Sequence, residues 1–265
     1  MVSLQFGAAV AAMLFPRAGV LGTTSLRMAI SAVVLLAVCR PRLRGRSRGD
    51  WTVVAGFAVA LTAMNVLIYQ AIARIPLGAA VTLEVLGPLV LSVVTGRRAS
   101  SWLWAGLALS GVALLGRGGF GALNPAGIAF ALGAAAMWAA YILLAARTGS
   151  RFARLDGLAL AMAVGALLSL PLGIAEAGGA LLEPATLALG AGVALLSSVL
   201  PYSLELLSLR RLPPTAFSVL MSLAPAVAAL AGCVVLGQRL GLLDVAAVAL
   251  VVIAAAGAVR PARPT

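Results

Sequence analysis

The sequence predicts an all-α integral membrane protein in which ten transmembrane helices form two inverted repeats of five. Three observations favour this fold class. First, the chain of 265 residues is 63% hydrophobic and only 10% charged, so it has more apolar surface than a soluble domain of this size can bury. Second, its apolar residues form stretches of about 20 residues, the length that crosses a bilayer. Third, residues 74–90 (RIPLGAAVTLEVLGPLV) reappear without a gap, 137 positions later, as residues 211–227 (RLPPTAFSVLMSLAPAV).

The duplicated segment indicates two copies of one unit. Seven of its 17 aligned pairs are identical, and the informative ones are arginine and proline, because Ala and Leu matches are common in this composition. These pairs are Arg74 with Arg211, Pro76 with Pro213 and Pro88 with Pro225. Duplicated membrane bundles with broken helices are typical of secondary transporters, which hold substrate between the halves near mid-membrane. The Gly-rich linker 117–125 (RGGFGALNP) then predicts one five-helix repeat in residues 1–118 and a second in residues 124–260.

Nine apolar stretches are long enough to cross a bilayer. In chain order they are residues 19–39, 52–73, 77–95, 101–116, 124–146, 155–175, 186–209, 213–237 and 241–259. A tenth stretch, residues 2–15, ends at Phe15-Pro16 and is too short to span comfortably, so we expect a short first helix. Because each repeat has an odd number of helices, the second copy is expected upside down relative to the first, as alternating access requires.

The distribution of arginine predicts the orientation, because basic loops stay in the cytoplasm. Fourteen of the 19 basic residues fall on one face of the ten-helix arrangement, and four fall on the other. Both termini are therefore expected in the cytoplasm. All 19 are Arg, which has GC-rich codons, and none is Lys; this usage favours a bacterial source and hence a multi-pass protein of the bacterial inner membrane. The net charge of +12 does not indicate nucleic-acid binding, because the arginines lie in short gaps between apolar stretches.

The residue inventory excludes several classes of site. The chain has no His, and its two cysteines, Cys39 and Cys233, lie isolated in apolar segments, which is typical of neither a disulfide framework nor a zinc site. The motifs HExxH, GxSxG and GxxxxGK[ST] are absent from the sequence. We therefore expect no catalytic residue, no metal and no cofactor, and a protein that is not an enzyme.

Only three ionisable residues lie well within the predicted spans: Arg27, Glu84 and Glu205. A charge at the bilayer centre costs at least a few kcal/mol, so each should face a partner or a wet cavity. At the repeat offset, Glu84 pairs with Met221 and Glu205 with Ile68, so the scaffold itself does not require either carboxylate. For Arg27 and Glu84 the competing interpretation is a mutual structural ion pair. Glu205 is equally well interpreted as a carboxylate that snorkels to the cytoplasmic interface.

Several predicted spans carry polar residues at three-to-four spacing, which places them on one helix face. These stripes are Thr23, Arg27 and Ser31; Thr62, Asn65 and Tyr69; Glu84, Pro88, Ser92 and Thr95; Trp138 and Tyr141; and Ser198, Tyr202, Glu205 and Ser208. Converging stripes predict a polar central cavity, although hydroxyl groups also pack helices closely and bond their own backbone.

The residues predicted to bind substrate in that cavity are Arg27, Asn65, Tyr69, Glu84, Trp138, Tyr141 and Tyr202. Intramembrane prolines free backbone carbonyl groups that can line a site. We expect this of the helix kinks at Pro88 and Pro225, which the repeat duplicates, and interpret Pro171 and Pro201 as simple bends.

Four segments together resemble a known family. They are residues 14–30 (LFPRAGVLGTTSLRMAI), 73–89 (ARIPLGAAVTLEVLGPL), 133–147 (GAAAMWAAYILLAAR) and 198–232 (SVLPYSLELLSLRRLPPTAFSVLMSLAPAVAALAG). They resemble the EamA group of the drug/metabolite transporter superfamily and, within it, are most similar to the threonine/homoserine exporters. The resemblance covers nearly the whole chain and implies ten helices in two inverted repeats and export of small polar metabolites. In two departures, the first helix is shorter and Gln238 stands in VLGQRL where many relatives carry Glu.

The function expected from these observations is secondary-active export of a small zwitterion such as threonine or homoserine, driven by proton antiport. By helix rise, Arg27 and Glu84 both lie about 10 to 12 Å below the outer surface, where they could bracket an amino acid. Poor solvation favours the neutral form of a carboxyl group, so Glu84 and Glu205 are the candidates for proton exchange. The expected partners are an amino-acid-like small molecule, the lipid bilayer and the proton, with no nucleic acid; a homo-oligomer is compatible with the sequence.

Two alternatives stay open. One is efflux of a drug-like or cationic metabolite through the same scaffold, using a carboxylate and the aromatic side chains of Trp138, Tyr141 and Tyr202. The other is a membrane-embedded enzyme or a non-transporting membrane subunit, which the missing motifs disfavour.

Overall fold

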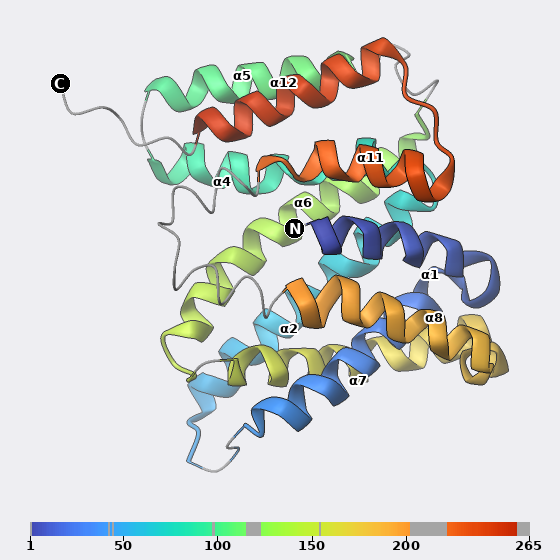
Figure 1. Ribbon diagram of the computed structural model, residues 1–265. Helices are drawn as coiled ribbons and strands as arrows, with labels where there is room; N and C mark the ends of the chain where they lie inside the picture. Colours follow the sequence, from blue (N-terminus) through green and yellow to red (C-terminus); the bar gives the residue numbers. More distant parts are fainter. Residues whose placement is uncertain are drawn as a thin grey trace.

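The protein is a bundle of α-helices (Figure 1). The structure is a computed structural model that describes residues 2–41, 43, 45–96, 99–114, 123–153, 155–201 and 222–258. Over these residues the helices are α1 (Val2–Cys39), α2 (Arg48–Ile72), α3 (Leu77–Glu84), α4 (Leu86–Gly96), α5 (Ala99–Leu114), α6 (Pro125–Gly149), α7 (Asp156–Ala177), α8 (Pro184–Ala194), α11 (Ala224–Leu236) and α12 (Leu242–Ala258). A 3₁₀ turn, η2 (Gly178–Leu182), follows α7, and a π-helical turn, η3 (Leu195–Val199), continues α8. The described residues contain no β-strand.

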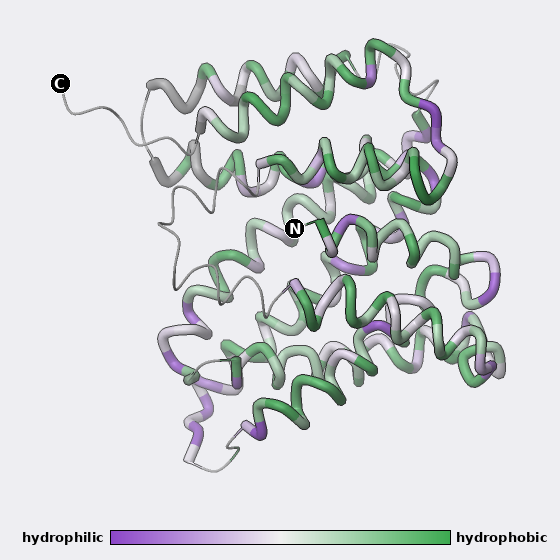
Figure 2. Tube along the Cα trace, viewed as in Figure 1, coloured by the Kyte–Doolittle hydropathy of each residue, from purple (hydrophilic) through white to green (hydrophobic). Residues whose placement is uncertain are grey.

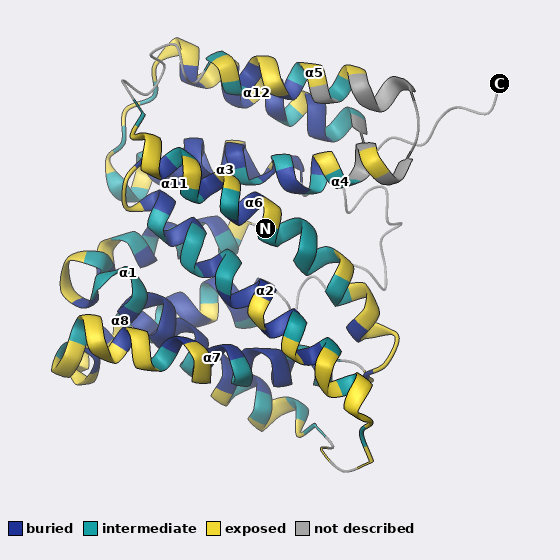
Figure 3. Ribbon diagram, turned by 180° about the vertical axis from the view of Figure 1, so that it is seen from behind, coloured by how far each residue is buried: buried dark blue, intermediate teal, exposed yellow. Residues whose placement is uncertain are grey.

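Four of the described helical segments are long and apolar enough to cross a membrane. They are Val2–Cys39, Arg48–Ile72, Pro125–Gly149 and Asp156–Leu182, and their most apolar windows have mean hydropathies from 1.8 to 2.2. Hydrophilic residues gather at the turns and helix ends, whereas hydrophobic residues run along the helices (Figure 2). Buried residues lie where helices face one another, and exposed residues lie on outward faces (Figure 3). The exposed residues include large hydrophobic ones such as Val38, Leu103 and Leu167. An apolar outer surface of this kind suits a lipid environment, so the predicted all-α integral membrane class is confirmed.

The first helix of the chain contains a sharp turn that makes it two segments. Gly19 has φ 66° and ψ 179°, a backbone conformation that only glycine adopts readily, and it separates residues 2–18 from residues 20–39. The predicted end of the first stretch at Pro16 is therefore wrong, because Pro16 lies inside the helix and the glycine makes the turn. Glu176, near the end of α7, accepts hydrogen bonds from the N–H groups of Leu21 (2.6 Å) and Gly22 (3.0 Å). This carboxylate thus caps the N-terminus of the second segment.

The two basic loops that join α1 to α2 and α6 to α7 lie together at one end of the bundle. Arg46 donates to the carbonyl oxygen of Arg151 (3.1 Å) and stacks on the Phe152 ring at 4.4 Å. Arg151 in turn pairs with Asp50 at 3.4 Å, the one ion pair among the residues that the structure describes. Ser47 and Asp50 form a capping box that starts α2 between these contacts. In the predicted arrangement the basic segments 40–50 and 147–154 belong to the arginine-rich face, and the contact between the two loops agrees with that grouping.

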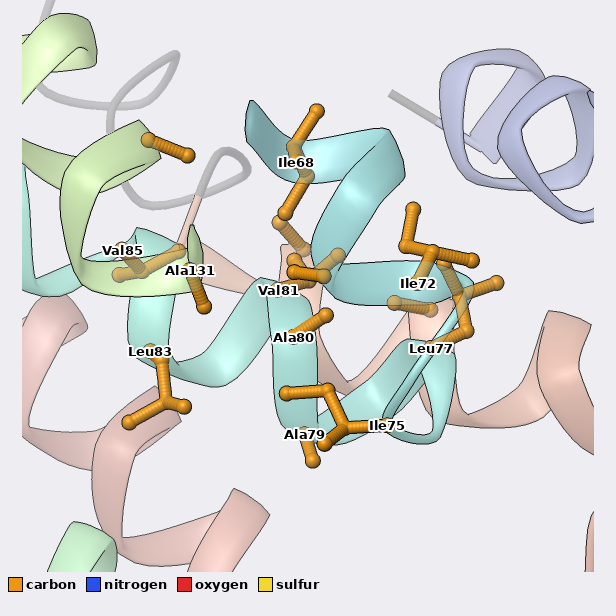
Figure 4. Close-up of a cluster of buried hydrophobic side chains, with 14 of the residues drawn as sticks. Ile68, Ile72, Ile75, Leu77, Ala79, Ala80, Val81, Leu83, Val85 and Ala131 are labelled. Atoms are coloured by element: carbon orange, nitrogen blue, oxygen red, sulfur yellow. The ribbon is translucent and has the colours of Figure 1, made fainter. Parts of the chain in front are cut away.

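The segment α3–α4 is one helix broken at Val85. Pro88 lies in the first turn of α4, where its missing N–H removes the usual backbone donor to the carbonyl of Glu84. The apolar side chains of α3 pack against α2 and α6 in the largest buried cluster, part of which is drawn in Figure 4. Just after the break, Gly87 lies directly against the backbone of α6: a Cβ atom there would be 1.9 Å from the Ala135 oxygen. Because Gly87 has no side chain, α4 can approach α6 more closely than any other residue at this position would allow.

We expect Gly87→Ala to destabilise the protein by about 1–3 kcal/mol, the usual range for overpacking, because α4 and α6 must move apart. The matched control is Gly106→Ala in α5, where a new Cβ atom meets nothing within 4 Å. That control should be neutral or stabilising by up to about 1 kcal/mol, since Ala is the better helix former. Thermal unfolding in detergent measures both, and an unchanged Tm for Gly87→Ala would contradict the close packing.

Candidate functional site

One cavity, of about 130 Å³, lies among α1, α2, α3, α6, η3 and α11, all of which contribute to its walls. It is lined by Leu4, Gln5, Ala8, Arg27, Met64, Asn65, Ile68, Tyr69, Ile72, Val81, Glu84, Trp138, Tyr141, Ser197, Pro201 and Ala224. An apolar protein cavity of about 150 Å³ holds a molecule of benzene, so the space suits a ligand of few heavy atoms. Six of the seven residues predicted to bind substrate line this cavity. The seventh, Tyr202, lies outside the described residues, as does Glu205.

Arg27 is buried, with 5% of its surface exposed, and its guanidinium group is held by three hydrogen bonds. Nε donates to Ser198 Oγ (3.1 Å), Nη1 to the Tyr69 hydroxyl (3.0 Å) and Nη2 to the carbonyl oxygen of Ser197 (3.0 Å). The guanidinium carbon also lies 5.5 Å from the centre of the Tyr69 ring. A guanidinium group has five N–H donors, so two remain for a ligand in the cavity. Arg27 is therefore a fixed positive charge that can still bind an anion.

Arg27 bonds the carbonyl oxygen of Ser197, and Pro201 is the reason that this oxygen receives no backbone hydrogen bond from residue 201. In η3 the Leu200 N–H bonds the carbonyl of Leu195, five residues back. Pro201 has no N–H, so residue 201 gives no bond to the carbonyls four and five residues before it, those of Ser197 and Leu196. Side chains take their place: Arg27 bonds the Ser197 oxygen, and Ser3 Oγ bonds the Leu196 oxygen at 2.6 Å.

The interpretation of Pro201 as a simple bend is thus wrong, because its freed carbonyl positions a charged residue of the cavity. The two duplicated prolines lie elsewhere along their helices. Pro88 is the third residue of α4 and Pro225 the second of α11. Each proline is in the first turn after a break, where the missing N–H is tolerated.

Glu84 is the last residue of α3, and its side chain reaches the cavity next to the break. The described part of the chain gives its carboxylate no hydrogen bond and no ion pair. In particular, Arg27 and Glu84 do not approach within the 4.0 Å of a salt bridge, so the alternative of a direct structural ion pair is wrong. Two opposite charges therefore face one small cavity, and Arg27 is satisfied by other groups while Glu84 has no partner among the described residues.

The other predicted residues shape the walls. Asn65 donates its amide N–H to the Leu61 carbonyl (2.8 Å), which leaves its own oxygen as an acceptor. The Tyr69 ring packs against Phe15 at 5.6 Å, and the Tyr141 ring against Phe57 at 5.2 Å. Trp138 and Tyr141 are half-buried on α6. Aromatic faces and a few polar groups around a concave space are typical of a small-molecule site.

Sequence reasoning missed two polar residues of the cavity, Gln5 and Ser197. The side chain of Gln5 is 95% buried on the first segment of α1, and Ser197 belongs to η3. A lone amide within the apolar stretch 2–15 was the available signal for Gln5, since a polar side chain inside hydrocarbon needs a reason. No sequence pattern predicted the π turn in which Ser197 lies.

Comparison with known proteins gives concordant matches. Residues 125–260 match the EamA-like transporter family. The chain is 37% identical over 265 residues to the threonine/homoserine exporter RhtA of Escherichia coli (strain K12), covering 99% of this chain and 90% of that protein. It is also 37% identical over 259 residues to the threonine/homoserine exporter RhtA of Salmonella typhimurium (strain LT2), covering 97% of this chain and 88% of that one. These relatives are exporters rather than enzymes, and the two kinds of match together show that the chain belongs to the EamA-like transporter family.

Proposed function

We propose that this protein exports small hydroxylated amino acids of the threonine and homoserine type across the bacterial inner membrane. The observation that carries the proposal is the placement of Arg27 and Glu84 in one cavity without an ion pair between them. An α-amino acid carries one carboxylate and one ammonium group, so it complements these two charges. The relatives are named as exporters of the same chemical class, which supports the proposal.

The cavity fits such a substrate in polarity as well as in charge. The two remaining N–H donors of Arg27 can hold a carboxylate, and the unpartnered Glu84 can accept an ammonium group. Binding therefore breaks no hydrogen bond that the described residues make to Glu84. Each charge gains a partner in a poorly solvated place, where pairing matters most.

The proposed architecture is ten transmembrane helices in two inverted repeats, residues 1–118 and 124–260. The helix contacts support this arrangement. In the proposed repeats, α6, α8, α11 and α12 correspond, in that order, to the first segment of α1, to α2, to α3–α4 and to α5. The contact of α2 with α6 then corresponds to that of α8 with α1, and the contact of α3–α4 with α6 to that of α11 with α1. Two further contacts, α5 with α12 and α3 with α11, map onto themselves. The residues that match the family coincide with the second proposed repeat.

We further propose that Glu84 exchanges a proton for substrate. Its carboxylate faces the cavity and has no partner among the described residues, so it can take up either a proton or an ammonium group, but not both at once. A carboxylate that binds either a proton or the substrate, but not both, is sufficient for antiport. The requirement is that the protonated protein and the substrate-bound protein can each change the side of the membrane to which the cavity opens. Glu205 stays a second candidate from the sequence.

Efflux of a lipophilic cation is the alternative function. Trp138 and Tyr141 beside Glu84 favour it, since aromatic faces bind cations. Arg27 argues against it, because a guanidinium group fixed in the same cavity repels a second cation. The amino acid is therefore the better fit.

Counterflow in proteoliposomes tests the function directly. Proteoliposomes that contain the purified protein and are loaded with unlabelled threonine should accumulate radiolabelled threonine and homoserine. A pH gradient that is acidic on the side to which substrate is exported should accelerate export. A panel of other amino acids and lipophilic cations defines the class. Accumulation of a labelled cation but of no amino acid would establish the alternative.

We expect cytoplasmic termini, from the arginine distribution, and cysteine labelling measures this. In a background with Cys39→Ala and Cys233→Ala, Gly179→Cys in the exposed turn η2 should react with an impermeant thiol reagent in intact cells. Leu43→Cys, which is exposed in the loop between α1 and α2, should react only after the cells are opened. The reverse pattern would invert the proposed orientation.

A further inference from the structure

Gln5 is a buried polar residue of the cavity that the proposed binding of a zwitterion leaves unused. Its side chain is 5% exposed and lines the cavity beside Leu4 and Ala8 of the same segment. No residue in the described part of the chain hydrogen-bonds its amide. An amide that no protein group binds has to find its hydrogen-bond partners in the cavity, either water or a ligand. An amide at a cavity wall that has no protein partner is placed to bind a polar group of the ligand.

The position of Gln5 is fixed by the residues on either side of it. Ser3 Oγ donates to the Leu196 carbonyl (2.6 Å), and Gly7 packs so closely that a Cβ atom there would lie 2.2 Å from Ser197 Oγ. Both contacts are to η3, the turn that also holds the guanidinium of Arg27 through Ser197 and Ser198. Gln5 and Arg27 are therefore anchored to the same turn from two different segments of α1.

We propose that Gln5 is a specificity-determining residue that hydrogen-bonds a hydroxyl group on the side chain of the substrate. This inference rests on the proposed export of amino acids. The charged groups of an amino acid already have charged partners in Arg27 and Glu84, so the neutral amide is left for a neutral group. An amide has both donors and an acceptor, and a hydroxyl group likewise donates and accepts, so the two match in either direction.

The inference assigns the preference for amino acids with a side-chain hydroxyl to one residue, Gln5. A site that is built to hydrogen-bond a hydroxyl rejects the analogue without it, because its own polar group is then left unpaired. Threonine and valine are the sharpest pair of probes, since they have the same shape and differ by a hydroxyl in place of a methyl group. A single neutral hydrogen bond of this kind gives a preference of about tenfold.

The test is competition against labelled threonine in proteoliposome counterflow, with unlabelled threonine and valine as competitors. The measured quantity is the ratio of their inhibition constants, which does not depend on the amount of active protein. The variant is Gln5→Met, which keeps the length of the side chain and removes the amide; Gln5→Leu is measured as well, in case Gln5→Met does not accumulate. The matched control is Gln70→Met, because Gln70 lies near the outer end of α2, bonds Arg74 and does not line the cavity.

Wild type and Gln70→Met should prefer threonine over valine by about tenfold. The Gln5 variants should lose this preference, chiefly by binding threonine more weakly. Retention of the wild-type ratio by Gln5→Met and Gln5→Leu would overturn the role of Gln5 and leave the proposed export intact. Absence of threonine counterflow in wild type would overturn the proposed function itself, and the role of Gln5 with it.

Discussion

Glu84→Gln is expected to insert and fold normally and to lose export by about tenfold to a hundredfold. The variant keeps the shape of the side chain and removes its charge, so it cannot form the charge-assisted bond to an ammonium group, worth about 1.5–3 kcal/mol. Folding should be unaffected, because the carboxylate has no partner among the described residues for the variant to strand. At the repeat offset Glu84 aligns with Met221, so the sequence predicts that the scaffold accommodates an uncharged side chain there.

The measurement is the initial rate of threonine counterflow at equal protein level, with size-exclusion chromatography in detergent as the check on folding. Glu183→Gln is the matched control, since Glu183 is an exposed residue that precedes α8 and lies outside the cavity. It should transport as wild type does. Wild-type export by Glu84→Gln would remove Glu84 from substrate binding and from proton exchange together.

Hydropathy alone predicted most of the helices, because in a membrane protein the length of an apolar stretch is fixed by the bilayer. The predicted spans 155–175 and 241–259 are observed as Asp156–Ala177 and Leu242–Ala258. The errors are at backbone features that composition does not mark. Gly19 makes a turn that Pro16 was expected to make, since in a glycine-rich membrane helix no local signal distinguishes the one glycine with positive φ.

Long-range contacts account for what the sequence could not predict about the ends of helices. Glu176 lies near the C-terminal end of α7, but it caps a different helix, 155 residues away in the chain, through Leu21. Gln238 likewise accepts the Leu77 N–H (3.1 Å) at the start of α3. An amide oxygen is sufficient for that hydrogen bond, which gives a physical account of Gln at a position where the resemblance led us to expect Glu.

In the candidate site, too, the sequence predicted which side chains line the cavity but not the long-range contacts that hold them. Polar stripes identified Arg27, Asn65, Tyr69 and Glu84 because helical periodicity determines which residues share a face. The partners of Arg27 could not be found in this way. One of them is the backbone carbonyl of Ser197, which accepts a side chain only because the helix widens into a π turn before Pro201. Backbone groups carry no sequence signal, so the geometry was needed to distinguish a paired arginine from an ion pair with Glu84.

Arg27 and Glu84 are expected to depend on each other through the cavity rather than through a direct bond. Arg27→Met should lower the amount of folded protein, because it leaves Ser198 and the Ser197 carbonyl without their donor and leaves the half-buried carboxyl group of Glu84 without a counter-charge. Glu84→Met should lower it less, since it breaks no hydrogen bond among the described residues. The double variant should recover part of the level lost in Arg27→Met, because the stranded negative charge is gone.

Export separates the two roles of the pair. If both charges bind the substrate, threonine counterflow is absent in each single variant and stays absent in the double variant even where its level recovers. If the pair only balanced charge, the double variant would export again. The control cycle uses Arg151→Met and Asp50→Met, whose ion pair is exposed at the end of the bundle. Asp50→Met also removes the capping box of α2 and should lower the protein level slightly, but neither change should affect export at equal protein level. Strictly additive losses of level at Arg27 and Glu84 would mean that the two charges do not interact, and one amino acid bound between them would then be excluded, because groups that grip one small zwitterion must lie close enough to influence each other.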